Sequence, residues 1–256
     1  YDVFLLQAYG HRRWQIDAGP NPPLDFRPDV ELKLLREFNA THDWVLGPGD
    51  MLYLPPGVPH NGVAEDACLT FSVGMRAPSA GELLGDFVDT LAADADDALR
   101  YADPDLVPPA DPNEIDVSAM NRAVEALNLL RMNDPDRLGD WFGRFITVYR
   151  AGGEVHGGGE SRSRIEIEWD LEHGASLYRH PYARMAWRRA QRKGEAARLF
   201  VNGQDYALPV GDAALIADAA QLDGAGYAAL SEAGRDLVQS LIQSGHFNLA
   251  LPDEEE

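Results

Sequence analysis

The chain has 256 residues and 45% hydrophobic content, enough for one large domain or two smaller ones with buried cores. Its apolar runs are too short for a membrane span of roughly 20 residues, so we expect no membrane partner and no signal peptide. The single cysteine, Cys68, excludes an internal disulfide framework and favours a reducing, cytoplasmic compartment. The net charge of −20 argues against general nucleic-acid binding and suits a basic partner or a solubilising surface.

The first 76 residues are β-rich. The run YDVFLLQAYGHRRWQI predicts two strands joined as a hairpin around Ala8 to Gly10. DWVLGPGDMLYLPPG predicts a strand, a turn at residues 47–50 and a second strand, and ACLTFSVGM predicts another strand at 67–75. Short strands separated by glycine and proline are typical of a sandwich or a barrel.

From residue 79 the pattern becomes helical. Ser79 is a possible N-cap for a helix over 79–101, and amphipathic helices are predicted at 117–132 and 135–150. The apolar positions of these helices suit core or interface packing. The glycine-rich segment 151–164 is typical of a linker.

Beyond the linker the order of elements is typical of a small winged-helix module over residues 165–256. We expect a short strand, a helix over 176–194, strands near 197–208 and 213–217, and a helix over 231–245.

A basic run over residues 178–198 holds seven of the 22 lysines and arginines. We interpret it as a solvated helix face or as a surface docked against acidic parts of the chain. Nucleic-acid contact by a winged helix is the alternative.

His60 ends a stiff turn, YLPPGVPH. Three prolines fix their own φ angles and disfavour helical geometry in the residue before each, while Gly57 allows a tight turn. The imidazole is therefore held in position before any ligand binds. The spacing of the glycines, Pro55 and His60 matches the second cupin motif, whose histidine binds a metal; a histidine that merely ends a proline turn is the alternative.

Arg12 is predicted to point toward the apolar side of its strand. In HRRWQI, alternation places Arg12, Trp14 and Ile16 on one face and their neighbours on the other. A guanidinium cannot be neutralised at working pH, so a buried one needs an anion. That anion is an internal carboxylate or a ligand carboxylate, unless the side chain extends to solvent at the strand end.

The strand LTFSVG alternates between two faces. Thr70, Ser72 and Gly74 form a small, polar face, which is typical of a ligand-filled barrel interior, although an ordinary solvent face would look the same. Tyr9, close to Arg12 in sequence, lines the pocket entrance or packs on the sheet.

Together these segments resemble a known family. YDVFLLQ, HRRW, PGDMLYLPPGVPH and FSVGMRAPS, followed by helices and a winged-helix end, are similar to the bacterial ribosomal oxygenases. The resemblance implies an α+β chain with three parts: a double-stranded β-helix of the cupin/JmjC type over 1–78 whose N-terminal part is missing, a helical dimerisation region over 79–150, and a winged-helix domain over 165–256.

The same resemblance implies an Fe(II)- and 2-oxoglutarate-dependent dioxygenase. His60 corresponds to the distal metal-binding histidine, and Arg12 to the basic residue that pairs with the far carboxylate of 2-oxoglutarate, assisted by Thr70 or Ser72. Tyr9, and more weakly Ser79, would contact the substrate. The implied target is an arginine side chain of a large-subunit ribosomal protein, a basic partner, and the implied assembly is a homodimer.

The sequence departs from the family at the metal. The family's His-x-Asp pair does not occur in these 256 residues and would fall just before Tyr1. Asp2 is a poorer carboxylate ligand, because the family spacing from that residue to the arginine is longer. Two alternatives stay open: a metal cupin enzyme that does not use 2-oxoglutarate, and a cupin sensor joined to a DNA-binding winged helix.

Overall fold

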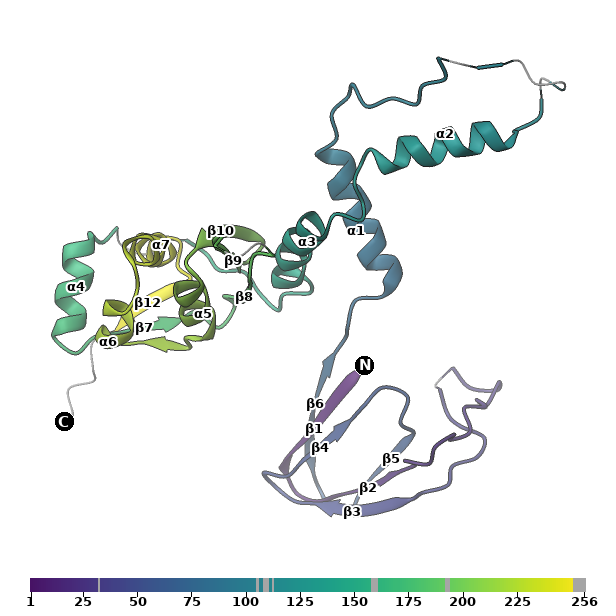
Figure 1. Cartoon of the computed structure of the whole chain (residues 1–256). Helices are drawn as coiled ribbons and strands as arrows, with labels where there is room; N and C mark the ends of the chain where they lie inside the picture. The colour runs from purple at the N-terminus through teal and green to yellow at the C-terminus, as the bar shows by residue number, and fades with distance from the viewer. Residues whose placement is uncertain are drawn as a thin grey trace. The chain divides into compact units, whose positions relative to one another are not determined.

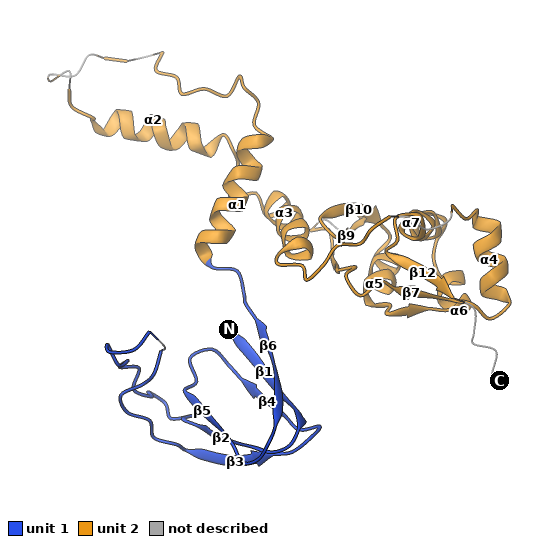
Figure 2. Cartoon of the chain, turned by 180° about the vertical axis from the view of Figure 1, so that it is seen from behind, with its two compact units in different colours: residues 1–79 blue, residues 80–256 orange. Residues whose placement is uncertain are grey.

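The computed structural model describes residues 1–31, 33–104, 106–107, 111, 113–157, 161–191 and 194–250. Figure 1 traces their helices and strands. The chain divides into two compact units, Tyr1–Ser79 and Ala80–Glu256, which Figure 2 colours separately.

The first unit consists of two three-stranded antiparallel sheets. One sheet has the order β4-β1-β6 and the other β3-β2-β5. The strands are β1 (Asp2–Tyr9), β2 (Arg12–Ile16), β3 (His42–Leu46), β4 (Met51–Leu54), β5 (His60–Ala64) and β6 (Leu69–Met75). The strands at 67–75 and on both sides of the 47–50 turn form as expected, whereas the sequence reasoning missed β5.

The predicted hairpin between the first two strands is wrong. β1 pairs with β4 and β6, while β2 pairs with β3 and β5, so the chain passes from one sheet to the other after Tyr9. Gly10 makes this crossing at φ 62°, and a Cβ there would lie 2.2 Å from the carbonyl oxygen of Ala67. Strands that alternate between sheets place the inner faces of both sheets around one interior.

The core of this unit is small. Leu5, Trp14 and Leu54 are its buried members, and they come from both sheets. Partly buried apolar residues pack around them: Val3, Ile16, Leu46, Leu52 and Val58. The core therefore holds the two sheets together from the inside.

The second unit begins with three helices. They are α1 (Ala80–Ala93), α2 (Val117–Asn128) and α3 (Pro135–Val148). Asp116 and Asp134 cap α2 and α3 by accepting backbone N–H groups of the first turn, and Pro135 occupies the first helical position of α3. The helix predicted over 79–101 ends earlier, at Ala93. Phe87 of α1 packs on Trp141 of α3 with 4.8 Å between ring centroids.

The remainder combines helices with two small sheets of orders β10-β9-β8 and β11-β7-β12. Its helices are α4 (Arg164–Glu172), α5 (Val210–Asp218), α6 (Gly224–Ala228) and α7 (Glu232–Gln243). Its strands are β7 (Ser176–Arg179), β8 (Met185–Arg188), β9 (Ala197–Val201), β10 (Gln204–Leu208), β11 (Gln221–Leu222) and β12 (Phe247–Ala250).

Three expectations for this region are wrong. The predicted helix over 176–194 instead forms β7 and β8, because Pro181 cannot continue a helix and the turn around it separates two strands. The predicted strand at 213–217 lies inside α5. The short strand expected after the linker is α4, which begins with a capping box between Ser163 and Glu166.

The core of this region is extensive. Buried side chains of α4, α5, α7 and the strands form one cluster that includes Ile167, Leu177, Leu199, Ile216 and Val238, each fully buried. No helix in the described part of the chain is long and apolar enough to cross a membrane.

Candidate functional site

Arg12 points into the barrel. Trp14, two residues further along β2, is 7% exposed, and alternation places Arg12 on the same face. Arg13 between them points outward, where its Nε donates to Glu65 at 2.6 Å and its Nη1 to Asp43 at 2.9 Å. These hydrogen bonds, the one to Glu65 first, raise the pKa of Arg13. The outer arginine is thus neutralised by two carboxylates.

The inner arginine has no such partner. Among the described residues no carboxylate lies within ion-pair distance of Arg12, which removes the internal ion pair as its explanation. Its Nη2 donates to Cys68 Sγ at 3.7 Å, its guanidinium carbon lies 5.7 Å from the centre of the Trp14 ring, and its Nε is buried without a hydrogen-bond partner. A partly buried cation in this state favours an anionic ligand.

His60 begins β5 directly after the proline turn. Gly57 has a φ of 83°, the left-handed conformation expected of the turn glycine. The Nδ1 atom of His60 lies 3.0 Å from the carbonyl oxygen of Val58. Since a carbonyl can only accept, Nδ1 carries a proton, and in the neutral form of this imidazole Nε2 has a free lone pair. Metal-binding histidines are commonly oriented by such a bond from the second ring nitrogen.

Arg12 and His60 share one face of one sheet. In the β2–β5 register Ile16 lies opposite His60 and Trp14 opposite Gly62, and residues opposite each other point to the same side. The Trp14 ring lies between the two groups, 5.7 Å from the Arg12 guanidinium carbon and 6.1 Å from the His60 ring. The inner face therefore carries an anion-binding group and a metal-capable group on either side of one indole.

Gly62 makes this arrangement possible. A Cβ at Gly62 would lie 2.5 Å from Cζ3 of Trp14, so any side chain there would displace the indole. The site residues that sequence reasoning missed are Trp14 and Cys68. Alternation gave the inward direction of Trp14, but nothing in the sequence placed Cys68, 56 positions further along the chain, beside Arg12.

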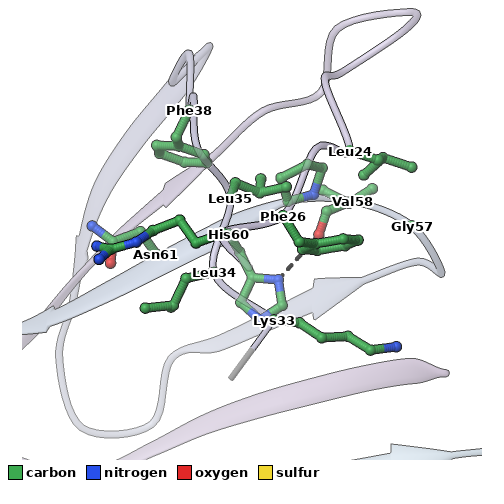
Figure 3. A pocket seen from close by; sticks show the side chains of 12 residues that line it. Leu24, Phe26, Lys33, Leu34, Leu35, Phe38, Gly57, Val58, His60 and Asn61 are labelled. Carbon is green, nitrogen blue, oxygen red and sulfur yellow. Dashed lines mark hydrogen bonds between the residues drawn. The ribbon is translucent and has the colours of Figure 1, made fainter. Parts of the chain in front are cut away.

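A pocket of about 520 Å³ surrounds His60. Its other walls come from the proline turn, β5 and the segment between β2 and β3, and Figure 3 shows these side chains near the imidazole: Leu24, Phe26, Lys33, Leu34, Leu35, Phe38, Val58 and Asn61. Arg27 also lines the pocket. Arg27 pairs with Asp29 at 2.6 Å, whereas Lys33 has no ion-pair partner in the described part of the chain. The pocket is apolar and carries positive charge.

Thr70 and Ser72 lie on the inner face of the other sheet. The β1–β6 register places Thr70 opposite Gln7 and Ser72 opposite Leu5, and both of these β1 residues are buried. Thr70 donates a hydrogen bond to Oε1 of Gln7 at 2.7 Å, while Gln7 donates to the backbone at Tyr9 and Gly10. This face of β6 lies on the side of the sheet that carries buried Leu5 and Gln7; Thr70 is partly buried there, whereas Ser72 is exposed.

Tyr9, Ser79 and Asp2 lie outside this cluster. Tyr9 is 65% exposed at the end of β1, and Ser79 directly precedes α1. Asp2 falls on the outer face of β1, where its Oδ1 accepts a hydrogen bond from the Tyr53 hydroxyl at 2.6 Å. Asp2 is therefore no metal ligand beside His60. Among the described residues no group of three or more metal-capable side chains exists, so these residues do not complete a metal site around His60.

Four arginines of the basic run in the second unit donate hydrogen bonds to other residues of that unit. Arg188 donates to Asp136 and Asp140 of α3, Arg198 donates to Asp205, and Arg184 donates to the Tyr149 carbonyl. Arg179 donates to the Ala217 carbonyl at 2.8 Å. Four of its cations therefore hold the fold together, as expected for docking against acidic parts of the chain, and they do not form a free phosphate-binding surface.

Both parts of the chain match known families. Residues 1–83 match the JmjC domain, and residues 130–248 match the ROXA-like winged helix. The chain therefore contains a region that matches the JmjC domain and a region that matches the ROXA-like winged helix, which confirms the predicted combination of a cupin-type barrel and a winged-helix domain. The winged-helix match begins inside the range predicted as a separate helical region.

The chain is also homologous to ribosomal oxygenases. It is 37% identical to the ribosomal protein uL16 3-hydroxylase of Escherichia coli over 153 residues, which are 59% of this chain and 40% of that protein. The structure of the Escherichia coli ribosomal oxygenase YcfD matches 98% of this chain and 64% of that one at a TM-score of 0.76 and 29% identity. YcfD in complex with cobalt and 2-oxoglutarate matches at a TM-score of 0.74 and 28% identity, over 97% of this chain and 64% of that one. The chain thus spans less than two thirds of the length of these relatives.

Proposed function

We propose that this chain serves an Fe(II)- and 2-oxoglutarate-dependent oxygenase that hydroxylates a ribosomal protein. The observation that carries the proposal is Arg12: a partly buried guanidinium without a carboxylate partner among the described residues, on the same inner face as His60. The JmjC match and the relative that binds cobalt and 2-oxoglutarate support it.

In this proposal Arg12 binds the far carboxylate of 2-oxoglutarate. The guanidinium presents a planar fork to the carboxylate, and Trp14 beneath it limits the directions the fork can take. Ser72 and Thr70 line the same interior from the facing sheet and assist in binding. Thr70 donates its hydroxyl proton to Oε1 of Gln7, so it would have to turn this proton away from Gln7 to donate to the carboxylate.

His60 fits one position of an iron site through its free Nε2 atom. Bound iron would supply the oxidising chemistry, and a two-histidine, one-carboxylate set is typical of such oxygenases. The described residues supply one ligand of that set, so we derive no catalytic step through the metal. What these residues do is orient the imidazole through the Nδ1 hydrogen bond to Val58 and line its surroundings with apolar side chains such as Leu24, Phe26 and Leu35.

The direct test is binding of 2-oxoglutarate to this chain. Arg12→Ala should weaken the affinity, measured by calorimetry, by roughly tenfold or more, because one charge-assisted pair contributes about 1.5–3 kcal/mol. Arg13→Ala is the matched control, since it removes the same charge from the same strand on the outer face. Equal losses in the two variants, or none in Arg12→Ala, would remove the cosubstrate assignment.

The proposed target is an arginine side chain of a large-subunit ribosomal protein. The relative in Escherichia coli is named for hydroxylation of uL16, and a chain of net charge −20 suits a basic protein. Exposed Tyr9 and Ser79 are the proposed substrate contacts. The test is mass spectrometry of large-subunit proteins treated with the enzyme: one added oxygen atom on an arginine supports the proposal, and modification only of other residue types contradicts it.

We also propose that the chain acts as a homodimer. α2 has no buried residue, yet Val117, Met120, Val124 and Leu127 form an exposed apolar stripe at helical spacing. A second copy would cover this stripe. Val124→Asp should convert a dimer to a monomer in light scattering, whereas Ser118→Asp, outside the stripe, should not; a wild-type monomer at micromolar concentration would contradict the proposal.

A further inference from the structure

A second pocket, of about 860 Å³, lies in the winged-helix region. It is formed by one side of α5 from Gly211 to Asp218, by β11 and the start of α6, and by one aromatic residue of β8. The side chains that define its chemistry are Trp187, Asp218, Gln221 and Asp223. This pocket belongs entirely to the second unit and shares no residue with the pocket around His60.

The lining carries negative charge and no cation. Asp218 ends α5, and its exposed carboxylate has no hydrogen-bond or ion-pair partner among the described residues. Asp223 uses one carboxylate oxygen to accept the Gly226 N–H at 2.8 Å. The C-terminal end of α5 adds the partial negative charge of its last carbonyl groups, and its last turn holds no basic residue of its own. Neither arginine nor lysine lines the pocket.

The arginines of this region are engaged elsewhere. Arg164 pairs with Glu168 at 3.1 Å and with Glu232, Arg188 with Asp136 and Asp140, and Arg198 with Asp205. Asp218 is left without such a partner among the described residues, and neither Arg189 over the Trp187 ring nor Arg179 at the end of α5 pairs with it.

Two arginines of the chain show which cation suits this environment. Arg189 places its guanidinium carbon 5.1 Å from the centre of the Trp187 ring, and Arg179 donates to the Ala217 carbonyl at the end of α5 at 2.8 Å. Stacking on an indole and hydrogen bonding to helix-end carbonyls are both favourable for a planar, weakly hydrated guanidinium.

We propose that this pocket docks an arginine side chain of a basic peptide, with Asp218 as the principal ion-pair partner and Trp187 as the aromatic wall. The inference goes beyond the oxygenase reaction and does not depend on it, because the pocket needs neither metal nor 2-oxoglutarate. It would give the winged helix a role in holding a basic protein partner through protein contacts.

The test is fluorescence anisotropy of a dye-labelled peptide of repeated Arg-Gly-Gly units, titrated with the whole chain at physiological salt without metal or cosubstrate. Asp218→Asn should weaken binding roughly tenfold, since it removes one charge-assisted pair. Glu172→Gln removes the same charge from the exposed end of α4, outside the pocket, and should change the affinity less than about twofold. Equal losses in the two variants would mean that only net charge attracts the peptide and would overturn the proposal.

Two further experiments test whether the pocket prefers arginine over other cations. The Arg-Gly-Gly peptide should bind more tightly than the matching Lys-Gly-Gly peptide, because an ammonium neither stacks nor pairs as a planar fork. Equal affinities, or displacement of the peptide by spermidine at equal charge concentration, would overturn the arginine assignment.

The Asp218 side chain makes no hydrogen bond or ion pair within the described structure. Circular dichroism of Asp218→Asn should therefore match the wild type, so a binding loss cannot be attributed to misfolding. Failure here would leave 2-oxoglutarate binding at Arg12 unaffected.

Discussion

The barrel and the winged-helix region differ in the size of their apolar cores and in how their arginines are paired. The winged-helix cluster has seventeen buried residues, whereas the barrel cluster has three, Leu5, Trp14 and Leu54. Arg188 in the winged-helix region forms ion pairs with two aspartates, whereas Arg12 in the barrel has no carboxylate partner among the described residues. The difference lies in the size of the apolar core and in the carboxylate partners of these two arginines. Each region also buries polar atoms without a hydrogen-bond partner: Arg12 Nε and Trp14 Nε1 in the barrel, Tyr227 Oη and Arg235 Nε in the winged-helix region.

The largest expected difference comes from truncating one core leucine in each region. Leu177→Ala should cost about 4 kcal/mol of unfolding free energy, because Leu177 is fully buried in the large cluster and leaves a cavity. Leu5→Ala should cost about 2 kcal/mol, since the sparse barrel core can close around the gap. Urea unfolding with separate probes for each unit measures both. Equal costs would contradict the contrast between the two cores.

A smaller effect is expected from adding a methyl group at a tight glycine in each region. A Cβ at Gly143 would lie 2.3 Å from the ring of buried Phe200, and one at Gly62 would lie 2.5 Å from Trp14. Gly143→Ala should cost about 2 kcal/mol even after its gain in helix propensity, because Phe200 has nowhere to move. Gly62→Ala should cost about 1 kcal/mol, because the indole can shift into the barrel interior.

The two glycine variants should differ more in binding than in stability. Thermal unfolding measures the stability costs, and calorimetry with 2-oxoglutarate should show a loss only for Gly62→Ala, whose displaced indole disturbs Arg12. A binding loss in Gly143→Ala, or none in Gly62→Ala, would argue against Trp14 as the support of Arg12.

The smallest effect is a pH dependence of the winged-helix region. Burial first, and the nearby His180 second, lower the pKa of His246 below its ordinary value of 6.5. As the pH falls below about 6.5, unfolded His246 takes up a proton before folded His246 does, so stability decreases toward acid. His246→Gln should flatten the unfolding free energy between about pH 6.5 and 5, above the range where most carboxylates titrate. An unchanged slope would assign this pH dependence to other groups.

Strand alternation, proline geometry and helix capping predicted several features from the sequence. Period-two alternation placed Arg12 and Trp14 on one face, in agreement with the strand register. The rigid hold on His60 stays a prediction, although its Nδ1 does bond to the Val58 carbonyl of the proline turn. Helices with capping aspartates, α2 and α3, also fell where helical spacing placed them. These features depend on residues within a few positions of each other.

The errors arose where long-range pairing outweighs local pattern. YDVFLLQAYGHRRW looks like a hairpin, yet β1 and β2 pair with strands that lie more than 25 residues away, and this pairing cannot be read from either strand alone. The basic run at 178–198 looked helical by composition, but β7 and β8 form because each adds to a sheet with distant partners.

By itself the sequence determined the backbone stiffness before His60, the inward direction of Arg12 and the excess of negative charge, because these follow from residue types and neighbours. Only the tertiary structure decided that Trp14 separates Arg12 from His60, that Cys68 reaches the guanidinium, and that Asp218 remains unpaired among the described residues. The reason is physical: a contact between residues tens of positions apart depends on the register of strands and the packing of helices, which are properties of the whole fold.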